Sequence, residues 1–262
     1  MLVTGAAGRI GTAVCAGLLD RGHGVAGLDL HPEPEGWAGP WWTVDCTDPD
    51  AVDAVLAAAP LDGIVHLAGN PGETGLEEAL RSHAVSTAAL LDAMVAHGVG
   101  RIVHASSHHA VGFAPRADLA GTDLPPRPDT FYGVAKVAAE ALLSLYADRH
   151  GLDAVACRIG SFRAEPATTR HLSTWLSPDD AVRMVEAALT APAPGFRIVY
   201  GISDNTRAWW DLGPGHDLGY HPQDDAEAYA DRVRPGPEEA ADAAYLGGGF
   251  TSAALVRPAL GT

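Results

Sequence analysis

The chain has 262 residues, of which 47% are hydrophobic, and a formal net charge of −16 at pH 7. This length suits one α/β domain with a core large enough to fold alone. The negative charge argues against nucleic acid and anionic membranes as partners, because both are bound through clustered cations. No apolar run approaches the roughly 18 residues that a membrane span needs. We therefore expect a soluble, enzyme-like protein.

Three cysteines, Cys15, Cys46 and Cys157, are widely separated and odd in number. They form no Cys-x-x-Cys pair, so we expect neither a disulfide framework nor a zinc knuckle. The N-terminus runs directly into a glycine-rich turn at Gly5, which leaves no room for a signal peptide. These features predict a protein of the reducing cytoplasm.

Short apolar runs alternate with amphipathic stretches rich in Ala and Leu, a pattern typical of βαβ units around a parallel sheet. The expected strands cover residues 1–3, 24–30, 63–67, 101–106, 153–159 and 197–201. The expected helices cover residues 10–21, 49–59, 76–97, 131–150, a segment that starts near Ser177, and 226–233. Two segments rich in Pro and Gly, 31–40 and 115–129, are expected loops, and the second could cover a substrate.

This pattern predicts an α/β fold with a Rossmann-type, doubly wound parallel sheet. We expect one domain over residues 1–262. Its dinucleotide-binding core would span about residues 1–160, and a reduced, mixed substrate-binding region would span about residues 161–262.

A glycine-rich turn closes the first strand and opens the first helix. Its glycines, Gly5, Gly8 and Gly11, permit backbone amides to approach a pyrophosphate at the helix N-terminus. Asp29 ends the second strand, where a carboxylate accepts both hydroxyls of an adenosine ribose and repels a 2′-phosphate. NAD is therefore favoured over NADP, although Arg9 inside the turn argues the other way.

Lys136 is the only lysine, and the other sixteen Lys/Arg positions are arginine. It follows Tyr132 by four residues, so the two side chains share one face of the expected helix. A compact ammonium beside a phenol favours the ionised phenol. The pair is either the centre of a catalytic site or an incidental pair on a solvated helix.

The glycine-rich turn, the Tyr132/Lys136 pair and Ser107, 25 residues before Tyr132, together resemble the extended short-chain dehydrogenase/reductase superfamily. Further segments are similar to the bacterial uronate dehydrogenases. These are residues 105–112, 131–136, 158–161, 165–166, 170–175, 209–211 and 218–222. In that family NAD oxidises the anomeric carbon of a hexuronic acid, which gives an aldarolactone.

The resemblance implies a role for each matching residue. Ser107, Tyr132 and Lys136 would be catalytic, with Tyr132 as the base. Arg170 would bind the uronate carboxylate through its planar guanidinium, unless it forms a surface ion pair. The implied cofactor positions are Gly5, Gly8, Arg9, Ile10, Gly11, Asp29, Leu30, Asp45, Cys46, Leu67, Ala68, Gly69, Tyr132, Lys136, Ile159 and Phe162. The implied substrate positions are Ser107, His108, His109, Tyr132, Ser161 and Arg170.

Three residues depart from the family pattern. Pro71 stands where uronate dehydrogenases have a serine, and His83 and His108 stand where the family has asparagine. These changes leave open whether the pocket is retuned. A metal site built from His104, His108 and His109 is not expected, because adjacent histidine side chains diverge and no carboxylate accompanies them.

Other functions share parts of this pattern. A sugar-nucleotide epimerase or dehydratase has the same fold, but the roughly 60 residues after Gly201 look too few to hold a nucleotide diphosphate. A catalytically silent dinucleotide sensor would typically lack the tyrosine or the lysine. A dehydrogenase of neutral sugars remains open. Because extended members often pair through the helices at 76–97 and 131–150, we expect a homo-oligomer that acts on a small sugar acid.

Overall fold

The computed structural model describes residues 1–117, 119–236, 244–255 and 258–259. Seven strands form the main sheet: β1 (Leu2–Thr4), β2 (Ala26–Asp29), β3 (Trp41–Thr43), β4 (Ile64–His66), β5 (Arg101–Ser107), β6 (Asp153–Ile159) and β9 (Phe196–Gly201). Their order is β3-β2-β1-β4-β5-β6-β9, and every neighbouring pair is parallel. The predicted Rossmann-type parallel sheet is confirmed.

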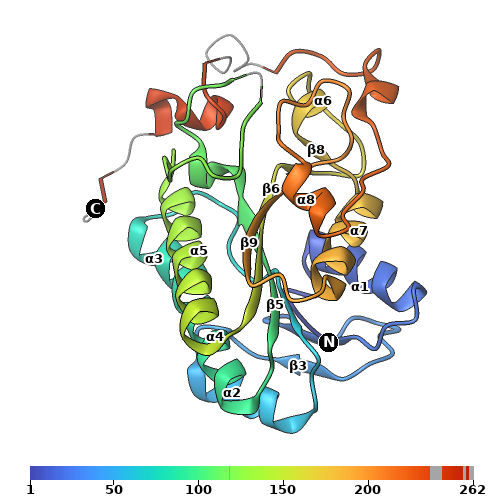
Figure 1. Ribbon diagram of the computed structural model, residues 1–262, viewed down its shortest axis with the longest axis vertical. Helices are drawn as coiled ribbons and strands as arrows, with labels where there is room; N and C mark the ends of the chain where they lie inside the picture. The colour runs from blue at the N-terminus through green and yellow to red at the C-terminus, as the bar shows by residue number, and fades with distance from the viewer. Residues whose placement is uncertain (118, 237–243, 256–257, 260–262) are drawn as a thin grey trace.

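Helices cover both faces of this sheet, as parallel strands require (Figure 1). The helices α2 (Pro49–Ala58), α4 (Ser86–His97) and α5 (Phe131–His150) lie on one face. The helices α1 (Arg9–Asp20) and α7 (Pro178–Thr190) lie on the other. Both α7 and β9 come from the part of the chain after residue 160. This part therefore adds a strand and a helix to the main sheet.

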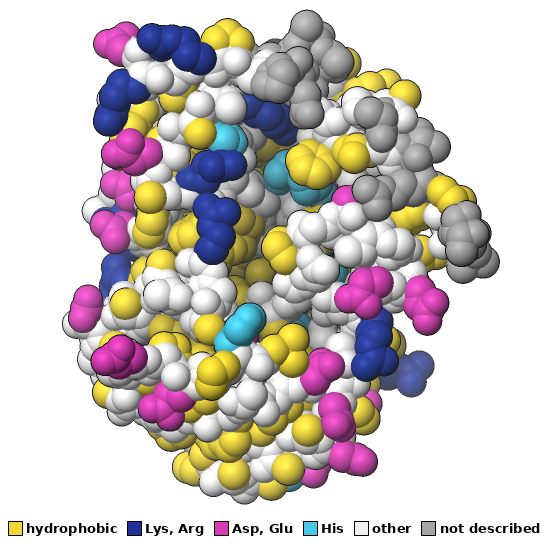
Figure 2. Space-filling view, turned by 180° about the vertical axis from the view of Figure 1, so that it is seen from behind, with side chains coloured by type: hydrophobic (Ala, Val, Ile, Leu, Met, Phe, Trp, Pro, Cys, Tyr) yellow, Lys and Arg dark blue, Asp and Glu magenta, His cyan; other side chains and the backbone are white. Residues whose placement is uncertain are grey.

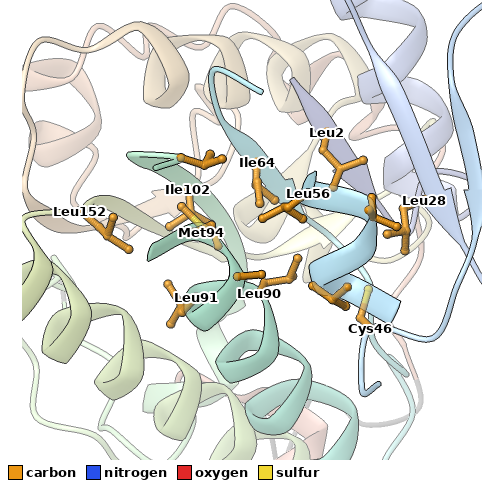
Figure 3. Packing of buried hydrophobic residues seen from close by; sticks show 14 of the residues in the cluster. Leu2, Leu28, Cys46, Leu56, Ile64, Leu90, Leu91, Met94, Ile102 and Leu152 are labelled. Atoms are coloured by element: carbon orange, nitrogen blue, oxygen red, sulfur yellow. The ribbon is translucent and has the colours of Figure 1, made fainter. Parts of the chain in front are cut away.

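The core lies between the sheet and its helices. Figure 3 shows Leu2 and Ile64 of the strands facing Leu56 of α2 and the side chains of α4, among them Leu90 and Met94. These five side chains are at most 3% exposed. Burial of each stabilises the fold by about 1.5–3 kcal/mol relative to an exposed side chain.

The predicted helix at 76–97 is interrupted. It consists of α3 (Leu76–Leu80), a π-helical turn η1 (Arg81–Val85) and then α4. Such single π turns place an extra residue in the helix and occur often at functional sites. This one carries His83, which is buried.

Two other elements differ from the prediction. The strand β3 was not predicted, because it has only three residues, two half-buried tryptophans and the exposed Thr43, which is too short to stand out as a strand. The helix predicted at 226–233 is a short 3-10 turn, η3 (Ala226–Tyr229). A side-chain cap from Asp225 starts this turn.

The remaining short elements lie in the upper half of Figure 1, beside and above one end of the sheet. They are η2 (His108–Val111), β7 (Ser161–Phe162), α6 (His171–Thr174), β8 (Trp175–Leu176), α8 (Gly213–Asp217), η4 (Gly248–Thr251) and η5 (Ala253–Leu255). None of the helices found among the described residues combines the length and hydrophobicity that a bilayer crossing requires.

Candidate active site

A groove follows the carboxyl ends of the central strands, where open α/β sheets bind ligands. It consists of two adjoining cavities of about 370 and about 420 Å³. Both cavities are lined by Gly5, Gly8, Leu67 and Gly69, so they form one continuous site. Figure 2 shows a face with a hollow near its centre, with hydrophobic side chains inside and basic and histidine side chains beside it.

The glycine-rich turn forms the boundary between the two cavities. Gly5 has a φ of +67°, and a Cβ there would collide with the backbone of Ala68. A Cβ at Gly11 would overlap the carbonyl oxygen of Gly5. Gly8 caps α1 without a side chain, and the first turn of α1 has no acidic residue. The helix therefore presents its amides to the groove, a cradle suited to a pyrophosphate.

Asp29 lies in the larger cavity, with Leu30, Asp45 and Cys46. Its Oδ2 accepts a hydrogen bond of 2.9 Å from the Ala7 amide, and its Oδ1 accepts bonds from the amide and the ring of His31. Partial burial raises the pKa of Asp29, but these hydrogen bonds outweigh it and hold the pKa below its ordinary value. The carboxylate is therefore ionised, as the ribose-binding prediction requires.

Tyr132 and Lys136 enter the smaller cavity from the first two turns of α5. Thr130 caps this helix through the Gly133 amide. The Lys136 side chain is 4% exposed, and its Nζ donates a 2.6 Å hydrogen bond to the Ala105 carbonyl. The same Nζ lies 5.4 Å from the centroid of the Tyr132 ring. The pair predicted from the sequence thus faces one cavity.

Ser107 completes the predicted catalytic set from the end of β5. Burial raises the pKa of Tyr132 to about 12, while a hydrogen bond with Ser107 works in the opposite direction. Burial also lowers the pKa of Lys136 to about 7, opposed by the negative charge of Glu140. The protein alone therefore keeps the phenol protonated, and further positive charge in the cavity would ease its ionisation.

A buried ion pair lies behind this set. Arg158 donates to both carboxylate oxygens of Glu140, over 2.9 and 2.8 Å, and Ser106 donates to the same carboxylate over 2.5 Å. All three residues are at most 5% exposed. Because Glu140 lies one turn after Lys136 on α5, this network fixes the ends of β5 and β6 against the catalytic helix.

His108 and His109 follow Ser107 and line the same cavity, with Phe250. The Nδ1 of His108 lies 3.0 Å from the carbonyl oxygen of Ile159, to which it donates. Burial, His109 and the charge of Arg170 hold the pKa of His108 well below its ordinary value. Its Nε2 is therefore an unprotonated acceptor.

Two predicted substrate residues lie outside this lining. Among the described residues, those that line the catalytic cavity do not include Ser161 or Arg170. Ser161 shares a 2.9 Å hydrogen bond with Thr174. Arg170 donates from Nη2 to the Leu246 carbonyl over 2.5 Å, and its guanidinium packs on Gly248. The charge of Arg170 lowers the pKa of His108, so Arg170 acts electrostatically on a residue of the cavity wall. Its role in binding the substrate carboxylate stays a prediction.

Residues that depart from the family pattern stand near Tyr132. Pro71 and His83 both line the catalytic cavity. His83 donates from Nε2 to the Asn70 carbonyl over 2.8 Å, and its ring meets the Tyr132 ring edge-on with centroids 5.0 Å apart. Its Nδ1 has no hydrogen-bond partner among the described residues. Both departures therefore change the wall that faces the predicted base.

Glu73 is a site residue that sequence reasoning missed. Its two carboxylate oxygens accept from the backbone amides of Phe131 and Tyr132, over 2.9 and 3.0 Å. The first turn of α5 has no acidic residue of its own, so this distant carboxylate satisfies two free amides and complements the helix dipole. The absence of an acidic residue from the first turn of α5 was the one signal in the sequence that a carboxylate from another segment would bind these amides.

Four histidines around the site form what we call the buried-histidine group: His66, His83, His104 and His108. Each is at most 6% exposed. Burial is the main cause that lowers their pKa values, to about 3 for His66 and His83 and well below the ordinary range for His104 and His108. No group of three or more His, Cys, Asp or Glu within the described ranges is arranged to hold a metal ion.

A profile of the NAD-dependent epimerase/dehydratase family matches residues 1–178. The chain belongs to this family. Uronate dehydrogenase from Pseudomonas putida (strain KT2440) is 37% identical to this family member over 259 residues, 97% of this chain and 96% of that protein. Uronate dehydrogenase from Agrobacterium fabrum (strain C58) is 39% identical over 231 residues, which cover 87% and 86% of the two chains.

A solved structure of this family has the same fold over almost the whole length. It is a mutant uronate dehydrogenase from Agrobacterium tumefaciens complexed with NAD, with a TM-score of 0.89 and 37% identity. The match covers 98% of each chain. This epimerase/dehydratase family member therefore matches uronate dehydrogenases beyond the Rossmann core, through the region that completes the pocket.

Proposed function

We propose that this protein oxidises the anomeric carbon of a hexuronic acid, of the galacturonate or glucuronate type, to an aldarolactone with NAD. The observation that carries the proposal is the convergence of Ser107, Tyr132 and Lys136 in a cavity continuous with the Asp29 site. Similarity to uronate dehydrogenases over nearly the full chain supports the substrate class. The reaction converts uronate and NAD⁺ into lactone, NADH and a proton.

The residues present fit a bound NAD. The cradle at Gly5 and Gly8 suits the pyrophosphate, and the ionised Asp29 suits the adenosine ribose. Lys136 can bind the nicotinamide ribose through a second donor, because an ammonium has three and Ala105 takes one. When bound, the oxidised nicotinamide supplies positive charge and accepts the hydride.

The proton is handled by the chain itself. A free phenol has a pKa of about 10, too high for a base at neutral pH. Lys136 favours the phenolate of Tyr132, which takes the proton of the C1 hydroxyl while Ser107 holds that oxygen. General-base help of this kind contributes about 10²–10⁴ in rate. Positioning of the sugar beside the cofactor supplies much of the remainder.

Arg170 is the proposed carboxylate clamp. Its fork matches a carboxylate, and one arm is already oriented by the Leu246 carbonyl. Hydrogen bonds to charged groups contribute about 1.5–3 kcal/mol, so Arg170→Ala should lower kcat/KM for uronates by roughly 10- to 150-fold. Arg163→Ala, at an exposed arginine, is the matched control and should leave kcat/KM unchanged. Unaltered uronate turnover in Arg170→Ala would show that Arg170 is not the clamp.

The substrate class is tested by NADH production on galacturonate, glucuronate, galactose and glucose. Turnover of the neutral sugars at least equal to that of the uronates would replace the proposal with a neutral-sugar dehydrogenase. Tyr132→Phe should abolish oxidation while NAD still binds. Substantial residual rate in that variant would remove Tyr132 from its role as base.

We also propose that the protein is a cytoplasmic homo-oligomer. Its three cysteines are buried free thiols, as expected in a reducing compartment. Val85, Val95 and Leu145, on the helices at 81–97 and 131–150, are 39–45% exposed, which supports pairing through these helices. Light scattering after size exclusion that shows only monomer would reject the oligomer.

A further inference from the structure

His109 pairs with a buried carboxylate at the edge of the catalytic cavity. Its Nδ1 lies 2.8 Å from Oδ2 and 3.1 Å from Oδ1 of Asp129. The Asp129 side chain has no exposed surface, and that of His109 is 11% exposed. Asp129 immediately precedes Thr130, the N-cap of α5, and nothing in the local sequence marks it as part of the site.

Asp129 is enclosed by two glycines from distant segments. A Cβ at either Gly112 or Gly247 would overlap its carboxylate. The Gly247 amide donates to the Gly112 carbonyl over 2.8 Å, which holds the two segments around the aspartate. The Thr130 hydroxyl donates to Oδ1 over 3.1 Å. The carboxylate therefore has a fixed place, where it needs strong donors because it is out of contact with water.

This arrangement determines which nitrogen of His109 carries the proton. A carboxylate only accepts hydrogen bonds, so the Nδ1 that contacts Asp129 must be the protonated nitrogen. In a neutral imidazole the other nitrogen, Nε2, then has a free lone pair. The ring packs in the cavity against Tyr132, with centroids 6.0 Å apart, and against Phe250, at 4.5 Å.

We propose that Asp129 is a positioning residue that fixes the tautomer of His109, so that Nε2 accepts a hydrogen bond from a hydroxyl of the bound sugar. This inference rests on the proposed function for the identity of the ligand. The tautomer itself rests on the contacts between His109 and Asp129 alone.

The neighbouring His108 makes the inference stronger. The Ile159 carbonyl fixes its tautomer in the same sense, with Nδ1 as the donor. The two rings lie side by side in the cavity wall, with centroids 4.2 Å apart. The wall next to Ser107 therefore presents acceptors, which select hydroxyl groups as donors. A site built to bind a hydroxyl discriminates against an analogue that lacks it, because its own polar group is then left unpaired.

The tautomer is measured by NMR on the full chain labelled with ¹⁵N-histidine. His109→Gln identifies the signals of His109 among the 12 histidines. We expect the wild type to carry the proton on Nδ1. Asp129→Asn presents an amide group in place of the carboxylate, so the proton should move wholly or partly to Nε2. A wild-type His109 protonated on Nε2 alone would overturn the proposal, whether or not the variant folds.

The consequence for substrate is measured with 2-, 3- and 4-deoxyuronates. In the wild type, loss of the hydroxyl that contacts His109 should lower kcat/KM by about threefold to tenfold, the range of a neutral hydrogen bond. In Asp129→Asn this penalty should disappear, whereas the KM for NAD stays the same. The same penalty in wild type and Asp129→Asn would overturn the proposal.

A matched control exists at the surface. His97 and Asp53 form a pair of 2.7 Å, with Asp53 55% exposed and outside both cavity linings. Asp53→Asn should leave every deoxyuronate penalty unchanged. If the wild type oxidises no uronate, the proposed function fails, and the NMR spectrum still decides the tautomer of His109.

Discussion

Lys136→Met removes the only lysine ammonium of the chain while it keeps a side chain of similar reach. In the structure the Lys136 Nζ lies 5.4 Å from the centroid of the Tyr132 ring. If the phenolate charge is placed at the ring centroid and the effective dielectric constant is about 20, the two unit charges interact by about 3 kcal/mol. This energy corresponds to about two pKa units on the phenol, so kcat/KM should fall roughly 100-fold near neutral pH.

The assay is kcat/KM for galacturonate as a function of pH. Burial brings the pKa of Lys136 to about 7, so the wild-type profile reports Tyr132 and Lys136 as a coupled pair. In Lys136→Met the rising limb should move toward alkaline pH by about two units, because the phenol must ionise without help. A profile that is lower in amplitude but unmoved along the pH axis would refute the reasoning.

Lys136→Arg separates charge from shape. It keeps a cation but places a wide guanidinium where Nζ now reaches the Ala105 carbonyl in a 4% exposed position. We expect a lower maximal rate and a rising limb closer to that of the wild type than in Lys136→Met. Full wild-type activity would mean that the single lysine among sixteen arginines is there by chance. Binding of NAD and the circular dichroism spectrum control for misfolding.

Three further predictions concern stability. Glu73→Ala leaves two amides of α5 without their acceptor, so it should lower the free energy of unfolding by about 1–2 kcal/mol and reduce kcat. Glu77→Gln, at an exposed position of α3, should do neither. Urea titration measures the free energy of unfolding, and an unchanged value in Glu73→Ala would disprove the prediction. Glu140→Gln leaves Arg158 buried without its counter-charge and should cost about 3–5 kcal/mol in the same assay, and a loss below 1 kcal/mol would contradict this estimate. The buried-histidine group should make the fold acid-sensitive. Its folded pKa values lie below those of the unfolded chain, so the unfolded state binds more protons, and each histidine removes up to about 1.4 kcal/mol per pH unit as pH falls below about 6.5. Urea midpoints that stay constant from pH 7 to pH 5 would contradict this.

Much of the fold could be predicted because buried parallel strands leave a direct trace in the sequence. Residues 63–67 and 153–159 are mainly apolar runs bounded by turns, and each became an interior strand of the sheet. The strand β3 left no such trace, since it lies at the sheet edge with half-exposed side chains. The π turn at Arg81–Val85 was equally hidden, because one extra residue barely changes helical periodicity.

Residues of the catalytic cavity could be predicted only where their position follows from a single helix or strand. The spacing of Tyr132 and Lys136 follows from one helix, and Asp29 ends a strand. Glu73 and Asp129 act through contacts instead: Glu73 reaches amides 58 and 59 residues away, and Asp129 contacts a histidine 20 residues before it. No periodicity links such positions, so the chain must fold before they can be related.

The strand order also determines when the site can be assembled during synthesis. Among the strands of the main sheet, β1 comes first in the chain but lies in the interior, and it cannot be enclosed until β4 arrives some 60 residues later. The last strand, β9, closes the edge of β6 after every catalytic residue has left the ribosome. A nascent chain stopped before residue 196 would therefore hold Ser107, Tyr132 and Lys136 beside an open, apolar sheet edge. We expect the finished sheet, and with it a protected site, to depend on synthesis of the chain through β9.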